Sequence, residues 1–256
     1  MRHLAPLFLL ATLSLSAAPA CAATLLTPKD LPLSAPIKDD VYGGGATIAV
    51  TQDVDGDLVV GGGTVSVQKH VTHDMLAAGG AVIITGSVDD DVRAAGGRVI
   101  VRGRIGSDLI VAGGNVLIDA PASVDGDVIA YGGSVTILGS VHGVRAAGGQ
   151  LRIATPVRGD LTVNAGDFIL NGVVLGKATI AADSIQLGKE AQFAGPVRYW
   201  RAAGPMDFGD SVKSGQNPVF DSALQNTVGT MRRNAVGSSA CCSAFSRSSR
   251  SSPPHS

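Results

Sequence analysis

The residues best suited to chemistry are aspartates that recur once in nearly every 17-residue segment of the chain. Regularly spaced carboxylates can bind a hard cation such as calcium, which takes several carboxylate and carbonyl oxygens. They can also accept hydrogen bonds from the backbone of their own turn, and no ion is then needed. We expect the turn role and keep a cation-binding edge as the alternative. The series consists of Asp57, Asp74, Asp91, Asp108, Asp127 and Asp160.

Polysaccharide cleavage is a second chemistry that carboxylates perform, with two or three Asp in a cleft beside Lys or Arg. An active site is a unique place on a scaffold, so its residues should depart from the repeat, usually on a lengthened loop. Here the Asp recur in nearly every segment, and the largest interior insertion is two residues, around Pro121. We therefore predict no catalytic residues, no cofactor and a protein that is not an enzyme.

Histidine offers a weaker signal, since the repeat tract contains only His70, His73 and His142. Residues three apart on a strand point to opposite faces, so His70 and His73 share a metal only if a turn intervenes. His142 lies in the first segment that lacks the Asp, and we expect an exposed turn residue there instead of a catalytic base.

These side chains are carried by nine consecutive segments that repeat one 17-residue phrase. The spacing is constant except for two extra residues around Pro121 and one missing residue near Val144. A fixed period this short predicts one stacked coil with no separate catalytic domain. The phrase begins at Gly45, Gly62, Gly79, Gly96, Gly113, Gly132, Gly148, Ala165 and Ala182.

Apolar residues alternate with polar or small ones inside each phrase, and places are counted from its first residue. In one segment the fourth, sixth, tenth, fourteenth and sixteenth places hold Val82, Ile84, Val88, Val92 and Ala94. Val and Ile at a period of two indicate strands, which here are too short to be stable alone. We predict an all-β fold, a single-stranded parallel β-helix of about nine to ten rungs. At a strand spacing of about 4.8 Å, residues 45–198 would form a rod roughly 43 Å long.

The tenth place predicts a buried column at the centre of this coil. Its members are Val54, Val71, Val88, Ile105, Val124, Val141, Val157, Val174 and Ala191. The 34 glycines are expected to supply positive φ at the corners. An aromatic share of only 4% fits a narrow core with no room for rings.

The two ends of the chain differ from the repeat. Residues 1–22 run from a charged start through an apolar stretch to Ala20-Cys21-Ala22, which predicts a signal peptide cleaved before Ala23. Lipid modification of Cys21 is the alternative. The apolar stretch is short for a membrane span of about 20 residues, so we expect no transmembrane segment in the mature chain.

Four regions follow from this organisation. After the signal peptide, residues 23–39 form a Pro-containing lead-in and residues 40–215 form the coil. Met206, Phe208 and Val212 match the fourth, sixth and tenth places of a degenerate tenth unit that we interpret as a cap. Residues 216–256 form a low-complexity tail without a period, which we expect to be disordered.

The net charge is −1, and the repeat tract shows no cluster of Lys and Arg. Phosphate binding needs such clusters, so the sequence argues against nucleic acid as a partner.

The repeat shows its cadence most clearly in Ser123-Val124-Asp125-Gly126-Asp127-Val128-Ile129-Ala130-Tyr131-Gly132-Gly133-Ser134-Val135-Thr136-Ile137. This cadence resembles that of the bactofilin family of polymer-forming cytoskeletal proteins. The resemblance covers about residues 40–215. It implies a right-handed parallel β-helix that needs no nucleotide and can associate end to end. Such association has a physical basis, because the end layers of a β-helix expose unpaired N–H and C=O groups.

These observations together predict a non-enzymatic, exported structural or scaffold protein of the cell envelope, in the periplasm or at the cell surface. Its expected partners are a second copy of itself, another envelope component or a polysaccharide. The alternative is a surface adhesin or polysaccharide-binding rod, followed by a carbohydrate-active β-helix enzyme.

Overall fold

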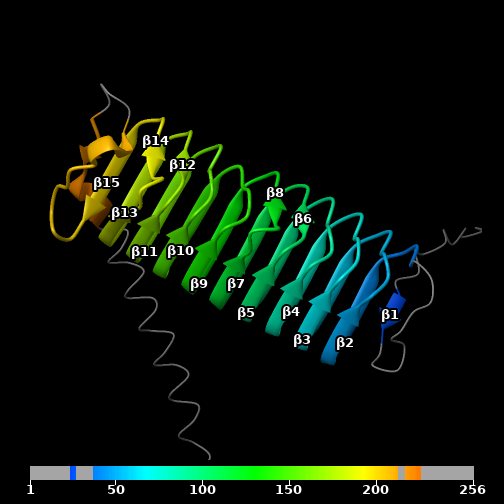
Figure 1. Ribbon diagram of the computed structural model, residues 1–256. Helices are drawn as coiled ribbons and strands as arrows, with labels where there is room; N and C mark the ends of the chain where they lie inside the picture. The colour runs from blue at the N-terminus through cyan, green and yellow to red at the C-terminus, as the bar shows by residue number, and fades with distance from the viewer. Residues whose placement is uncertain (1–23, 27–36, 213–216, 226–256) are drawn as a thin grey trace, which may run out of the picture.

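The computed structural model describes residues 24–26, 37–212 and 217–225. The predicted signal peptide, most of the lead-in and the tail beyond residue 225 lie outside this part of the chain. Within it the fold is all-β, a parallel β-solenoid of about ten coils of about 17 residues each. The predicted fold class is therefore confirmed, and Figure 1 shows the coils as one row of parallel strands.

One long strand from each coil contributes to a single parallel sheet, in which sequence neighbours pair in register. Most of these strands contain 10 residues. The sheet follows the order β1 (Thr24–Leu26), β2 (Val41–Val50), β3 (Leu58–Val67), β4 (Met75–Ile84), β5 (Val92–Val101), β7 (Leu109–Ile118), β9 (Val128–Ile137), β10 (Val144–Ile153), β11 (Leu161–Leu170), β13 (Ala178–Leu187), β15 (Val197–Arg201) and β16 (Val219–Phe220).

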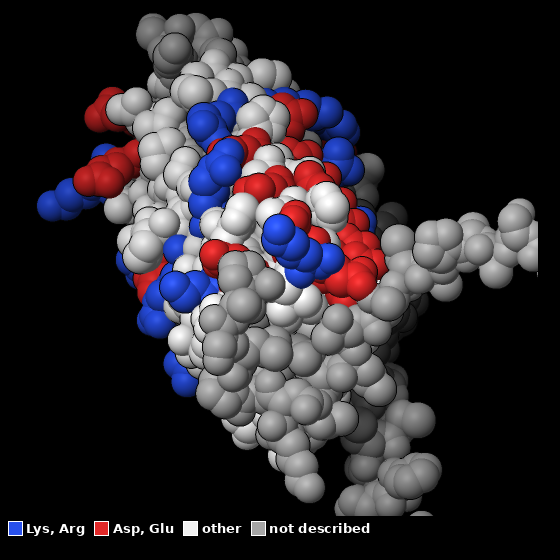
Figure 2. Space-filling model, turned by 90° about the vertical axis from the view of Figure 1, so that its right-hand side faces the viewer, with Lys and Arg blue, Asp and Glu red and all other residues white. Residues whose placement is uncertain are grey.

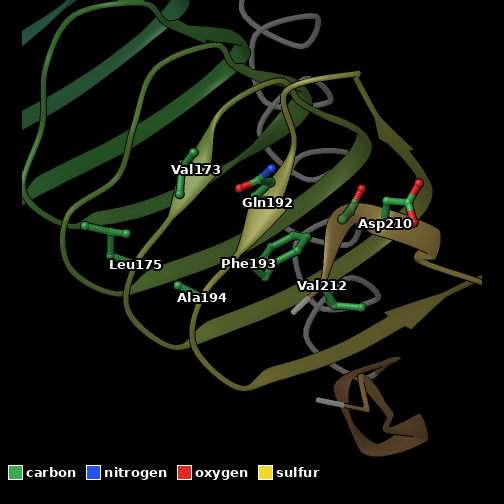
Figure 3. A pocket seen from close by; sticks show the side chains of 8 residues that line it. Val173, Leu175, Gln192, Phe193, Ala194, Asp210 and Val212 are labelled. Carbon is green, nitrogen blue, oxygen red and sulfur yellow. The ribbon is translucent and has the colours of Figure 1, made fainter. Parts of the chain in front are cut away.

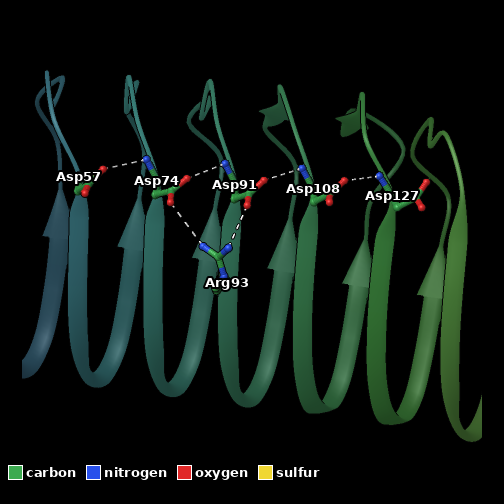
Figure 4. Close-up of polar contacts among 6 residues, drawn as sticks. All are labelled: Asp57, Asp74, Asp91, Arg93, Asp108 and Asp127. Atoms are coloured by element: carbon green, nitrogen blue, oxygen red, sulfur yellow. Dashed lines mark hydrogen bonds and ion pairs between the residues drawn. The ribbon is translucent and has the colours of Figure 1, made fainter.

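The long strands bend near their middle, and most of them carry a glycine pair there. In β5, Val92 and Ala94 are buried before the pair, and Val99 and Val101 are buried after it. Ala94 and Val99 are five residues apart, so simple alternation would place them on opposite faces. The bend at Gly96–Gly97 returns both halves of the strand to the core, and Figure 4 shows the ribbon turning in this way in successive coils.

The two halves of each bent strand form two sides of the coil. A short third side completes it and carries the tenth-place column. It consists of β6 (Arg104–Ile105) paired with β8 (Ser123–Val124), β12 (Val173–Val174) paired with β14 (Gln192–Phe193), and single bridges. The bridges run from Ile37 through Val54 to Ile105, and from Val141 to Val174. Val54, Val71, Val88, Ile105, Val124, Val141, Val157 and Val174 are all 0% exposed.

The last predicted member of this column is wrong, because Val174 pairs with Phe193 and not with Ala191. A second insertion causes the shift, since Ala178 pairs with Val197 nineteen residues later. The two extra residues form a turn at 189–190, like the turn at 120–121. Ala191 is buried, and it occupies the place that Ala122 holds in the earlier insertion.

Two expectations about composition are also wrong. Among the described residues only Gly204 and Gly209 have positive φ, and neither belongs to a regular coil. Glycine is needed for a different reason: a Cβ on Gly96 would lie 2.6 Å from the carbonyl oxygen of Gly79 in the preceding coil. The core also accepts rings, since Phe168 and Phe193 are 0% and 1% exposed.

The stack extends beyond the predicted limits of 40 and 215. At its start Ile37 bridges Val54, and β1 pairs with Val41–Gly43 of β2. At its end Val212 bridges Phe193, and β16 pairs with β15. Two short 3-10 helices, η1 (Gly209–Ser211) and η2 (Ser222–Leu224), flank β16 in the chain. None of the described helices has the length and apolar character of a membrane span.

Candidate functional site

The recurring aspartates form a chain of hydrogen bonds along one edge of the solenoid, continuous from Asp40 to Asp127 and here called the aspartate spine (Figure 4). In each link, Oδ1 of one Asp accepts a hydrogen bond from the backbone N–H of the residue at the same place in the next coil. From Asp40 to Asp127 these N···O distances lie between 2.7 and 3.2 Å. Asp160 accepts in the same way from the N–H of Lys177, at 2.9 Å. The spine comprises Asp40, Asp57, Asp74, Asp91, Asp108, Asp127 and Asp160.

This geometry corrects one detail of the turn hypothesis. The carboxylates bond to the backbone of the following coil, and not to that of their own turn. Backbone N–H groups at the corner between two sides need an acceptor, because an unpaired donor that loses water is costly. The Asp side chain supplies this acceptor and ties neighbouring coils together, so Oδ1 of each spine residue already has a partner.

The spine is interrupted where the chain is one residue short. Gly143 stands at the place of the missing Asp, and the Nδ1 atom of His142 lies 3.1 Å from Oδ1 of Asp127. The imidazole therefore contacts the oxygen that a backbone N–H engages in the other links. His142 is exposed, as we expected of a turn residue.

Arg93 joins two members of the spine from the outer face of β5 (Figure 4). Its guanidinium lies 3.0 Å from Oδ2 of Asp91 and 3.5 Å from Oδ2 of Asp74. A hydrogen bond from Ser107 lowers the pKa of Asp91, followed by the Asp108 N–H; burial acts in the opposite direction, and Arg93 adds smaller lowering contributions. Asp91 is thus held as a carboxylate.

A second set of polar contacts follows the short third side. Arg102 contacts Asp119 at 2.8 Å, and this hydrogen bond is the main reason that the pKa of Asp119 is lowered. The Nε2 atom of His70 lies 2.9 Å from Asp89. Within the described ranges, no three His, Cys, Asp or Glu side chains are grouped as a metal site. Cation binding along the spine stays a hypothesis.

Two hollows open on the surface of the described residues. One, of about 330 Å³, lies at the C-terminal coils between the short strands β12 and β14 and the segment around η1 (Figure 3). Its lining combines apolar and polar side chains, with Asp210 at one side (Figure 3). The full lining is Val173, Leu175, Gln192, Phe193, Ala194, Asp210, Ser211 and Val212.

The other hollow, here called the polar groove, has a volume of about 370 Å³ and crosses β9, β10, β11 and β13. Residues at the third and fifth places of the phrase face outward on these strands and form its two sides. Buried fourth-place residues, Val135 and Leu151, lie between the sides. The side chains lining the two sides are Ser134, Thr136, Gln150, Arg152, Asp167, Ile169 and Gln186.

The two ends of the stack differ. At the C-terminal end, Tyr199 packs edge to face against Phe208 and Phe220, with ring centroids 4.8 and 5.6 Å apart. Arg198 and Asp221 form an ion pair that ties β15 to the residue after β16. The Arg198 hydrogen bond and the Ala223 N–H lower the pKa of Asp221. These contacts define the C-terminal cap.

At the N-terminal end, β1 pairs only with Val41–Gly43, so the outer edge of β2 from Gly44 to Val50 faces no other strand among the described residues. Figure 2 looks at the molecule from this end and shows acidic side chains gathered on one side of it. The aspartates of the first two coils are Asp39, Asp40, Asp53, Asp55 and Asp57.

No protein-family model matches the chain, and searches of curated proteins and of solved structures find no significant match. The class that the fold defines is a parallel β-solenoid protein.

The sequence identified the spine residues but missed two features of the surface. Arg93 occupies the fifteenth place, which holds Leu76 in one neighbouring coil and Ile110 in the other. The polar groove arises where the fifth place changes from Ile83, Ile100 and Leu117 to Thr136 and Arg152, beside a third place that is polar in most coils. This change is visible in aligned phrases, and it becomes informative only once both places are known to face outward.

Proposed function

We propose that this chain is a non-enzymatic structural rod of the cell envelope, exported by its N-terminal segment and acting by shape and self-contact. The main support is the regular stack: coil after coil places the same column in the core, and most coils place an Asp on the spine. From Val41 to Arg201 the coils depart from their 17-residue period by no more than two residues, as between Ala178 and Val197, and only the last pairing, of Tyr199 with Phe220, is longer.

The two ends suggest how such rods associate. A resemblance to bactofilins implies end-to-end contact, which requires an open strand edge. The β2 edge, which faces no other strand among the described residues, offers one, whereas the C-terminal cap packs Phe208 and Phe220 against Tyr199 of the last coil. Association through β2 edges then joins two rods by their N-terminal ends and stops at a pair.

Two acidic ends repel each other when they approach, and salt screens this repulsion over about 10 Å at 0.1 M ionic strength. We therefore expect pairing of rods to increase as salt is raised.

Negative-stain electron microscopy of the chain from Ala23 onward tests this function. Ten coils at about 4.8 Å give single rods about 48 Å long and pairs about 96 Å long. Ala49→Pro should abolish the pairs, because proline removes an N–H from the β2 edge while edge strands tolerate it. The matched Ala49→Val variant keeps the N–H and should pair normally. Long filaments, or equal pairing of both variants, would contradict the proposal.

Export is tested separately. We expect the mature protein to begin at Ala23 and to be released with the periplasmic or surface fraction, as measured by mass spectrometry of its N-terminus. A chain that retains residues 1–22, or one that carries a lipid on Cys21, would refute cleavage before Ala23.

A further inference from the structure

The polar groove is built by four neighbouring strands of one rigid sheet. Its third-place side runs through Ser134, Gln150 and Asp167, and its fifth-place side runs through Thr136, Arg152, Ile169 and Gln186. Residues two apart on a strand lie about 6.6 Å from each other along it, and four coils span about 14 Å along the rod axis. The groove is therefore a shallow channel parallel to the rod axis.

Its polar side chains are available for a ligand. Gln150, Arg152, Asp167 and Gln186 are exposed, and within the described residues none of these side chains makes a hydrogen bond or an ion pair. The groove thus presents unused donors and acceptors, held by backbones that the sheet fixes in place.

The charge and shape of the groove restrict what it can bind. One Arg and one Asp leave it without net charge, which does not favour a polyanion or a polycation. Amides, hydroxyls and a guanidinium offer donors and acceptors at close spacing. Ile169 is half-buried on one side and supplies an apolar contact.

We propose that the polar groove binds an uncharged, linear, hydroxyl-rich glycan along the rod axis. The two rows of polar side chains bond to the hydroxyl or acetamido groups of successive sugars, and the apolar contact at Ile169 takes the C–H face of one sugar. This site is separate from the β2 edge, so it does not depend on rod pairing.

The same surface changes toward the N-terminal coils, where the fifth places are apolar at Ile83, Ile100 and Leu117 and the third places hold Ala81, Arg98 and Asn115. A second copy of the chain would bind better to that apolar fifth-place row than to the groove. The glycan therefore belongs to the polar coils, from β9 to β13.

Isothermal titration calorimetry of the full chain tests the site, with cellohexaose and chitohexaose as uncharged probes and hexagalacturonate as an anionic one. We expect saturable binding of at least one uncharged probe. The double variant Gln150→Ala/Gln186→Ala should weaken it at least about tenfold, since two hydrogen-bonding side chains are lost. The control Thr47→Ala/Thr64→Ala, at exposed third places of β2 and β3, should bind like the wild type.

Three results would overturn the site. The first is no saturable heat with either uncharged probe at millimolar concentration. The second is equal affinity in the groove variant and the control, and the third is tighter binding of the anionic hexamer. If the groove variant lowered the sedimenting mass and left sugar binding unchanged, the groove would be a contact between copies, and the glycan proposal would also fail.

Discussion

At the scale of single residues, the spine shows how one side chain compensates for a gap in a backbone pattern. Except at Asp127, each spine Asp accepts a hydrogen bond from a backbone N–H of the next coil, as Asp74 does from Asp91 at 3.1 Å. Asparagine could accept the same bond, but it would lose the charge that Arg93 contacts. The carboxylate therefore serves both hydrogen bonding along the rod and ion pairing across it.

Acid should weaken the rod partly through Asp91. The folded-state pKa of Asp91 is lowered from its ordinary value, chiefly by Ser107. Its contribution is therefore present above a pH of about 4 and is lost as the pH falls through the folded pKa. Asp91→Asn should cost less than about 1 kcal/mol at neutral pH, because the pair is exposed. On acidification from pH 5 to pH 3, the midpoint temperature of thermal unfolding should fall less in this variant than in the wild type.

Asp167→Asn provides the control, because Asp167 has no hydrogen bond or ion pair within the described residues. It should lose as much stability on acidification as the wild type does. An acid response that is identical in all three proteins would show that Asp91 does not contribute to it.

At the scale of elements, glycine requirements depend on the place in the phrase. A Cβ on Gly62 would lie 2.3 Å from the carbonyl oxygen of Gly45, whereas the nearest atom to a Cβ on Gly61 is 3.9 Å away. Gly62→Ala should therefore destabilise the fold by about 1–3 kcal/mol through overpacking. Gly61→Ala should be neutral or stabilising by up to about 1 kcal/mol, because alanine restricts the unfolded chain.

Chemical denaturation of the two variants measures this difference. The larger loss should depend on the coil, because β11 and β13 accommodate the buried alanines Ala165 and Ala182 at the same first place of the phrase. Equal stability of the two variants would mean that backbones in the N-terminal coils are free to separate.

The tenth-place column gives a second test of the element scale. Val124 is 0% exposed, so Val124→Asp would bury a charge without a partner and should cost several kcal/mol, on the order of 3–5. Its neighbour Ser123 is only partly buried, and Ser123→Asp should leave the midpoint of thermal unfolding nearly unchanged. Equal midpoints would place Val124 outside the core.

At the scale of the whole molecule, most of the solenoid could be predicted from the phrase, because its apolar places are inward-facing in every regular coil. The error at Ala191 arose because the second insertion falls in Gly188-Lys189-Glu190, which lacks the proline that marked the first. The aromatic core residues could not be foreseen from a low aromatic share, since Phe193, Tyr199 and Phe208 are concentrated in the last coils.

The polar groove and the cap depend on relations between coils that one phrase does not contain. Gln150 and Gln186 belong to opposite sides of the groove and lie two coils apart, so only the register brings them to one surface. Likewise, the partners of Tyr199 come from an irregular segment and from β16.

The measurement that tests the central claim most directly is sedimentation velocity of the chain from Ala23 onward, over a range of concentrations and at low and high salt. A rod with one open end predicts an equilibrium between one copy and two, shifted toward two by salt, with frictional ratios of elongated particles. Species that keep growing beyond two copies, or a compact particle that never associates, would contradict it.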